Sequence, residues 1–327
     1  MDARIITKLF HEGLINEQEF NNLTLQKDTP VSVHWDLRTL LYLGIVLFTT
    51  AIGILIYKNI ETIGHSAMLV IIGALSATCF GYCIKKSNGY NNAKVESPDI
   101  WFDYVLLLGC LLLLTFTGYV QYAYNVFGNQ WGLALFIPMI ILFIAAYYFD
   151  HLGVLSLAIT NFAAWAGISV TPLRILKEND FDDRHISYVG LLIGVSLVAM
   201  AFFVRYKKIK AHFAFTYKNF GAHIMFISLL SLISDYGNFY LIWFIIFAGV
   251  AFLFFKDAIR ENSFYFMVIT LLYAYIGLSH GIVQLLLLGG FETILIYGGI
   301  IYFILSGIGL IRLFIHYNKI FKKNAGI

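Results

Sequence analysis

Five polar side chains that could carry protons or bind a polar ligand lie within or beside long apolar stretches: Asn161, His223, His280, Gln284 and Glu292. His280 and Gln284 are four residues apart, so they share one face of a helix. A histidine exchanges protons near neutral pH, and an amide both donates and accepts hydrogen bonds. Because such groups are costly in an apolar surrounding unless they face a partner or water, we predict that they line a polar path.

Each of these residues also has a simpler possible role. Asn161 could hydrogen-bond a neighbouring helix and so contribute only to packing. His280 could mark the solvated end of a helix. Gln121, Asn125 and Glu292 could lie in the headgroup zone of a membrane.

Apolar helices must position these residues. Of the 327 residues, 60% are hydrophobic and 13% are charged, whereas soluble domains are about 45–50% apolar and about 25% charged. A membrane span needs roughly 20 apolar residues. The stretches that lack Asp, Glu, Lys and Arg are 39–57, 62–84, 104–149, 151–173, 185–204, 219–234, 236–255, 262–291 and 293–311. Gly128-Asn129-Gln130 divides the longest in two, so we predict an all-α polytopic membrane protein with ten transmembrane helices.

Positive residues predict the orientation of this bundle. If the chain begins inside and crosses ten times, 18 of the 22 Lys and Arg residues fall on the inner side. Both termini are therefore expected in the cytoplasm, with residues 37–316 as the bundle and 317–327 as a basic tail. The net charge of +3 reflects this topology and contact with anionic lipid, and it predicts no nucleic-acid partner.

Residues 1–36 are expected to form a short cytoplasmic helical hairpin and a linker. Leu9 and Phe10 lie on the apolar face of a first helix, and Asn16 followed by Glu19 is typical of the start of a second. The hairpin could bind a cytoplasmic protein partner, or it could cap the inner face of the bundle.

The first and sixth predicted spans share a pattern, Tyr42-Leu43-Gly44 in one and Tyr188-Val189-Gly190 in the other. With five spans in each half, two such halves would be inverted relative to each other, as in many secondary transporters. A chance match between apolar sequences is the alternative. The stretch 262–291 is longer than one span needs, so it is either one tilted helix or a helix broken near His280.

Three functions compete. The first is a transporter or permeation protein for a small solute or a proton-coupled substrate. The second is a non-catalytic scaffold or sensor that acts through the hairpin. The third, an intramembrane enzyme, would need a cluster of groups such as Asp103, Asp150 and His151. The sequence has no phosphate-binding glycine loop, zinc signature or nucleophile elbow, so we predict no enzyme activity, cofactor or metal.

Several segments of the first half resemble one family. They are Gly13-Leu14-Ile15, Leu40-Leu41-Tyr42-Leu43-Gly44, Tyr57-Lys58-Asn59 and Phe149-Asp150-His151-Leu152-Gly153-Val154-Leu155-Ser156. This pattern is similar to the domain-of-unknown-function 2157 family of predicted bacterial membrane proteins, across roughly residues 1–170. The resemblance implies a multi-pass protein of the bacterial cytoplasmic (inner) membrane and implies no particular chemistry.

Overall fold

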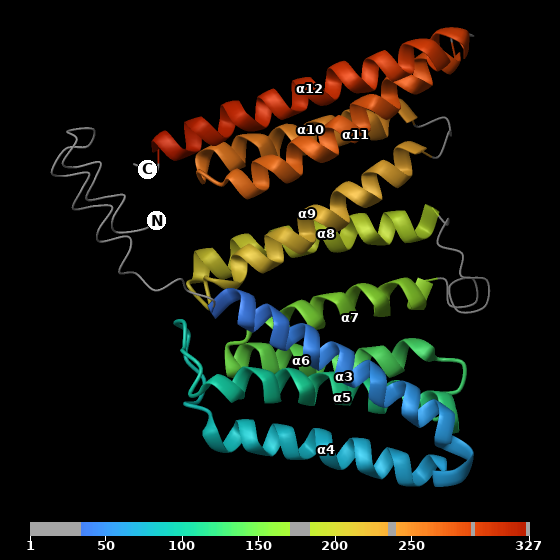
Figure 1. Ribbon diagram of the computed structural model, residues 1–327, viewed down its shortest axis with the longest axis vertical. Coiled ribbons are helices and arrows are strands. Elements are labelled where there is room, and N and C mark those ends of the chain that lie inside the picture. Colours follow the sequence, from blue (N-terminus) through green and yellow to red (C-terminus); the bar gives the residue numbers. More distant parts are fainter. Residues whose placement is uncertain (1–33, 171–183, 235–239, 289–291, 325–327) are drawn as a thin grey trace, which may run out of the picture. The chain divides into compact units, whose positions relative to one another are not determined.

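The computed structural model describes residues 34–170, 184–234, 240–288 and 292–324, and every element in these residues is a helix. The helices are α3 (His34–Ile63), α4 (His65–Lys86), α5 (Ile100–Tyr124), α6 (Trp131–Phe149), α7 (Leu152–Val170), α8 (Arg184–Lys207), α9 (Phe213–Ser234), α10 (Tyr240–Arg260), α11 (Phe264–Leu288) and α12 (Glu292–Asn324) (Figure 1). Each of the ten predicted spans overlaps one of these helices. The predicted N-terminal hairpin lies outside the described residues.

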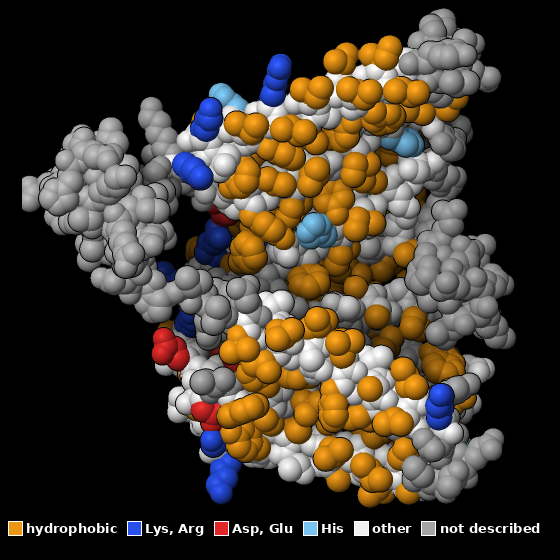
Figure 2. Space-filling model, viewed as in Figure 1, with side chains coloured by type: hydrophobic (Ala, Val, Ile, Leu, Met, Phe, Trp, Pro, Cys, Tyr) orange, Lys and Arg blue, Asp and Glu red, His pale blue; other side chains and the backbone are white. Residues whose placement is uncertain are grey.

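Eight of the described helices are long and apolar enough to cross a membrane, namely α4 to α8 and α10 to α12. In α3 the apolar part is the shorter Thr39–Leu55, and α9 is not among the eight. Figure 2 shows apolar side chains over much of one face, with charged side chains mostly toward its left edge. A protein surface of this kind is suited to lipid rather than to water.

Local side chains decide where several helices begin and end. The Asp99 side chain accepts a hydrogen bond from Phe102 N at 2.8 Å and caps α5. Gln121, 1% exposed, donates to Gly128 O at 2.9 Å and accepts from Phe127 N at 2.9 Å. This amide therefore holds the turn that divides the longest apolar stretch.

Two of the long C-terminal helices are continuous. α11 runs unbroken through His280 to Leu288, so the alternative of a break at that residue is not observed. α12 continues to Asn324, so most of the tail predicted from residue 317 is helical. Pro138 lies within α6, which continues past it.

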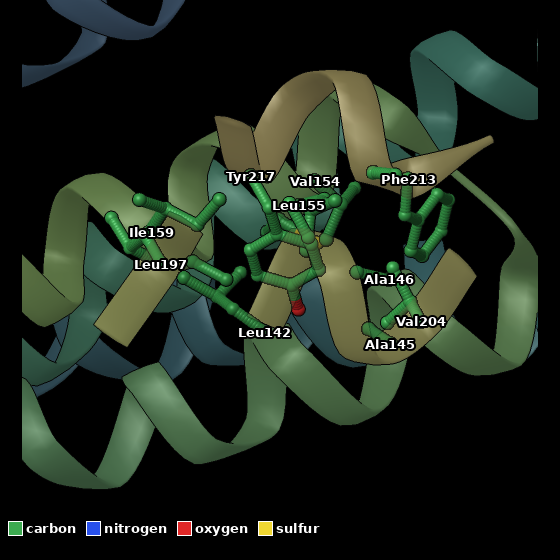
Figure 3. Packing of buried hydrophobic residues seen from close by; sticks show 14 of the residues in the cluster. Leu142, Ala145, Ala146, Val154, Leu155, Ile159, Leu197, Val204, Phe213 and Tyr217 are labelled. Carbon is green, nitrogen blue, oxygen red and sulfur yellow. The ribbon is translucent and has the colours of Figure 1, made fainter. Parts of the chain in front are cut away.

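The chain has two compact parts, Met1–Thr62, to which α3 belongs, and Ile63–Ile327. The second part has its largest apolar core where α6 and α7 meet α8 and α9 (Figure 3). The side chains labelled there are Leu142, Ala145, Ala146, Val154, Leu155, Ile159, Leu197, Val204, Phe213 and Tyr217, all of them at most 4% exposed. This interface is closely packed and apolar.

The helix contacts of the second part recur with a shift of four helices. α5 packs on α4, α6 and α7, and α9 packs in the same way on α8, α10 and α11. α6 packs on α7 as α10 packs on α11, and α7 packs on α8 as α11 packs on α12. Helices four apart in an alternating bundle run in the same direction. The two inverted five-helix halves expected from the sequence are therefore not confirmed, and the recurring units are α4–α7 and α8–α11.

Two turns repeat the same geometry in these units. Asp150 after α6 and Asn262 after α10 both have a left-handed backbone, with φ of 58° and 50°. The next residue, His151 or Ser263, accepts a hydrogen bond from the backbone N–H three residues later, at 3.0 Å and 3.5 Å. Its own N–H donates to the carbonyl of a buried alanine five residues earlier in both turns. The two turns thus have the same pattern of caps and hydrogen bonds.

At Gly194 the backbones of α8 and α9 lie close together. A Cβ there would lie 2.8 Å from Met225 N and 2.9 Å from Met225 Cα, both backbone atoms. We expect Gly194→Ala to lower the free energy of unfolding by about 2 kcal/mol, because the helices must move apart. Unfolding in mixed micelles, followed by tryptophan fluorescence, measures this. In the control Gly249→Ala the new Cβ meets nothing within 4 Å, and equal effects of both substitutions would contradict the prediction.

Candidate functional site

Hydrogen-bonded polar side chains join α9 to α11. His223 Nδ1 lies 2.9 Å from the Tyr273 hydroxyl, with the two rings edge to face. One turn away, the Tyr265 hydroxyl donates to Asn219 Oδ1 at 2.8 Å. Asn219 and His223 are four residues apart, so they share one face of α9. Both tyrosines lie on α11, and each α9 side chain therefore has a phenol partner.

Two further predicted residues continue along α11. His280 lies two turns beyond Tyr273, and Gln284, 7% exposed, one turn further. The His280 and Tyr240 ring centroids are 6.3 Å apart, which places His280 beside α10. Asn219, His223, Tyr265, Tyr273, His280 and Gln284 are called the α9–α11 polar row below.

The other two predicted residues lie apart from this row. Asn161 is 6% exposed in α7, and its Nδ2 donates to Leu135 O of α6 at 2.8 Å. The structure therefore gives Asn161 the helix-to-helix hydrogen bond that was the simpler of its two roles. Glu292 begins α12, but its side chain lies outside the described residues.

A charged cluster lies at one end of the polar row. Lys218 of α9 is 5% exposed, and its Nζ is 2.5 Å from Asp257 Oδ2 and 2.6 Å from Glu261 Oε2. The ammonium also lies 4.3 Å from the Phe266 ring centroid. Glu261 pairs in addition with Arg205 of α8. Lys218 therefore points away from water, and the cluster of Lys218, Asp257, Glu261 and Arg205 links α8, α9 and α10.

The contribution of the Glu261 carboxylate to the stability of the fold depends on pH. Burial alone would raise the pKa of Glu261, but hydrogen bonds from Lys218 and Arg205 outweigh it and hold the pKa below its ordinary 4.5. A lowered pKa contributes stability that is complete above the ordinary value and is lost as the pH falls below it. We expect the melting temperature of Glu261→Gln to lie below that of the wild type at neutral pH and to approach it as the pH falls below 4.5. Glu96→Gln, which removes an exposed carboxylate, should show no such convergence.

A second charged cluster joins three connecting segments. Asp150, with a side chain 1% exposed, lies 3.0 Å from Lys210 Nζ and 2.6 Å from His212 Nε2, and it accepts from Val95 N at 2.5 Å. A carboxylate only accepts, so Nε2 of His212 carries the proton. Lys210 is 0% exposed. Asp150, Lys210 and His212 are called the Asp150 cluster, and the end of the helices where it lies is called the Asp150 end.

The acid and base groups considered for an enzyme meet close to this cluster. His151 Nε2 lies 3.8 Å from Asp103 Oδ1, which also accepts from Ser97 Oγ at 2.5 Å. His151 is 4% exposed, so the pair is not open to a substrate in this conformation. Within the described residues, no group of three or more His, Cys, Asp or Glu side chains could hold a metal ion.

A pocket of about 330 Å³ lies at the opposite end, between the start of α6 and the end of α7. Its lining includes the indoles of Trp131 and Trp165. A Cβ on Gly132, another lining residue, would lie 2.8 Å from Ser169 Oγ. None of the five predicted polar residues lines this pocket.

The sequence contained weak signals for the charged clusters. Asp257 and Glu261 are four residues apart directly after an apolar stretch, and Lys218 lies within α9. Lys210 and His212 lie in a short basic turn that insertion topology alone explains. Nothing in the sequence shows which carboxylate each cation meets, since the partners are 39 to 62 positions apart.

The helices with the length and apolar character of membrane spans define a polytopic α-helical membrane protein. Residues 7–155 match the model of the family described as predicted membrane protein (DUF2157). This match confirms, over those residues, the resemblance seen in the sequence. No curated protein and no solved structure matches the chain.

Proposed function

We propose that this protein couples the passage of a small solute to proton movement across the bacterial cytoplasmic membrane, with ten membrane spans and the α9–α11 polar row as the proton-carrying part. The observation that carries the proposal is the His223–Tyr273 pair, 2.9 Å apart. His223 lies at the midpoint of α9, which runs from Phe213 to Ser234. A histidine bonded to a phenol in the middle of a membrane helix can exchange a proton with it.

The length of the row supports this assignment. Tyr265 and Gln284 are separated by about 28 Å along α11, at roughly 1.5 Å per residue. A bilayer core is about 30 Å thick. The row therefore offers polar groups at several depths from one side of the core to the other.

The recurring units also support a transport role. Parallel repeats, related by an axis along the membrane normal, occur in several transporter folds. Asn161 of α7 follows the turn at Asp150 by as many residues as Tyr273 of α11 follows the similar turn at Asn262. Asn161 therefore corresponds to Tyr273. Both units thus carry a polar side chain at this position.

The proposed orientation places the Asp150 end and both termini in the cytoplasm. Lys85 and Lys86 end α4, and Arg205 and Lys207 end α8, at this side of the bundle. Lys and Arg concentrate on the cytoplasmic side of membrane proteins. The proposed activity is not enzymatic, because the carboxylate of Asp150 already accepts from three donors and is 1% exposed.

Proton movement in reconstituted vesicles tests the function. The full chain is placed in liposomes that contain a pH-sensitive dye, and a potassium diffusion potential, negative inside, drives proton uptake. We expect faster internal acidification than in protein-free liposomes, and a further change in rate when a transported solute is added. Acidification equal to that of protein-free liposomes would overturn the proposal.

A further inference from the structure

The Asp150 cluster connects parts of both recurring units. Asp150 lies in the turn between α6 and α7, and Lys210 and His212 lie in the turn between α8 and α9. The segment between α4 and α5 is bound to both turns: Val95 N donates to Asp150, and Lys210 N donates to Asn92 O at 2.8 Å. Lys210 Nζ also donates to Ala93 O at 3.3 Å. One ion pair therefore holds three connecting segments together.

The cluster covers the end of the interface between the units. Two residues of the apolar core labelled in Figure 3 adjoin it: Ala146 lies four positions before Asp150, and the Phe213 ring lies 4.7 Å from the His212 ring, both residues being 0% exposed. Within this interface the hydroxyls of Tyr147 and Tyr217 are 3.0 Å apart. If the cluster opened, water would reach side chains that are now dry.

We propose that the Asp150 cluster, with residues 92–95 as its cover, is a closure that keeps the interface between α4–α7 and α8–α11 shut to water at the Asp150 end. The charges attract strongly because both ions are out of water, and removal of either ion leaves the other buried without its partner. When either charge is removed, the closure opens, and residues 92–95 separate from the two turns. This role does not depend on proton movement along the α9–α11 polar row.

Cysteine labelling tests the closure. Cys79, Cys83 and Cys110 are first replaced by alanine in the full chain, and Ala146→Cys is introduced as a reporter. The test variant is Asp150→Asn. Asparagine adopts the left-handed backbone of this position readily, and its side-chain oxygen can still accept the hydrogen bond from Val95 N, but it carries no charge. We expect a membrane-impermeant maleimide to label position 146 at least about tenfold faster in Asp150→Asn than in its parent.

Two controls separate opening from general loosening. Lys86→Met breaks an exposed ion pair with Asp99 at the same end and should leave the labelling rate unchanged. A second reporter, Ala158→Cys, lies deeper on α7, where Ala158 is 0% exposed. Its labelling rate should increase less in Asp150→Asn than the labelling rate of position 146. Unchanged labelling of position 146 in folded Asp150→Asn, or equal gains at positions 146 and 158, would overturn the proposal.

Hydrogen exchange of the unsubstituted chain provides a second test that does not require a variant to fold. The closure predicts that the amides of Val95 and Lys210 have the same free energy of opening once the intrinsic exchange rate of each is divided out, since both are released in one opening step. It also predicts that they exchange faster than the core amides of α6 to α9. Independent exchange of the two amides, or exchange only together with the core, would contradict it.

Discussion

Replacing Lys218 by methionine is expected to lower the free energy of unfolding by about 3 kcal/mol, the largest stability effect foreseen for a single side chain here. Methionine preserves the length and the packing against Phe266 but removes the charge between Asp257 and Glu261. Two carboxylates, each with a side chain 17% exposed, are then left close together without the cation that lies between them. Unfolding of the purified protein in mixed micelles measures the change.

The controls for this prediction use the same cluster. Arg260 also pairs with Asp257, at 2.8 Å, but its side chain is 70% exposed, so Arg260→Met should change stability by less than about 0.5 kcal/mol. Lys218→Met combined with Asp257→Asn and Glu261→Gln removes the unpaired charges and should be more stable than Lys218→Met alone. If Lys218→Met is no less stable than Arg260→Met, the ion pairs of Lys218 contribute nothing to the packing of α8, α9 and α10.

Replacing His223 by phenylalanine is expected to reduce protein-dependent proton uptake in the liposome assay to the level of protein-free liposomes. Phenylalanine retains an aromatic ring beside Tyr273 but offers no nitrogen to accept or release a proton. Tyr273→Phe removes the partner hydroxyl and should reduce uptake as well, though less, because His223 remains able to titrate. Initial acidification rates at equal protein density give the comparison.

The matched control for His223 is Asn161→Ala. Asn161 occupies the position in α7 that corresponds to Tyr273 in α11, but its hydrogen bond is to the backbone of α6. We expect this substitution to leave the proton uptake rate unchanged while lowering stability by about 1 kcal/mol. Full uptake in His223→Phe, or a loss in Asn161→Ala as large as in His223→Phe, would be incompatible with a path confined to α9 and α11.

The helices themselves were largely predictable from the sequence. Each of the ten predicted spans overlaps a described helix, and the division at Gly128-Asn129-Gln130 falls between α5 and α6. The ends were less predictable, since caps act through single side chains, as Asp99 does at the start of α5. The inverted halves of five helices are also not confirmed. Similar residues in the first and sixth spans suggested halves of five helices, whereas the contacts recur every four helices.

By itself, the sequence determined the apolar helices that the structure describes and approximately where each begins and ends. The physical reason is that a backbone in lipid must satisfy its hydrogen bonds within each helix, so helix position follows from local composition. Only the tertiary structure decided which polar side chains meet. It joined His223 to Tyr273, left Asn161 to bond α6, and paired Asp150 with Lys210. These pairings depend on how each helix is rotated against its neighbours, and side-chain packing between residues far apart in the chain sets that rotation.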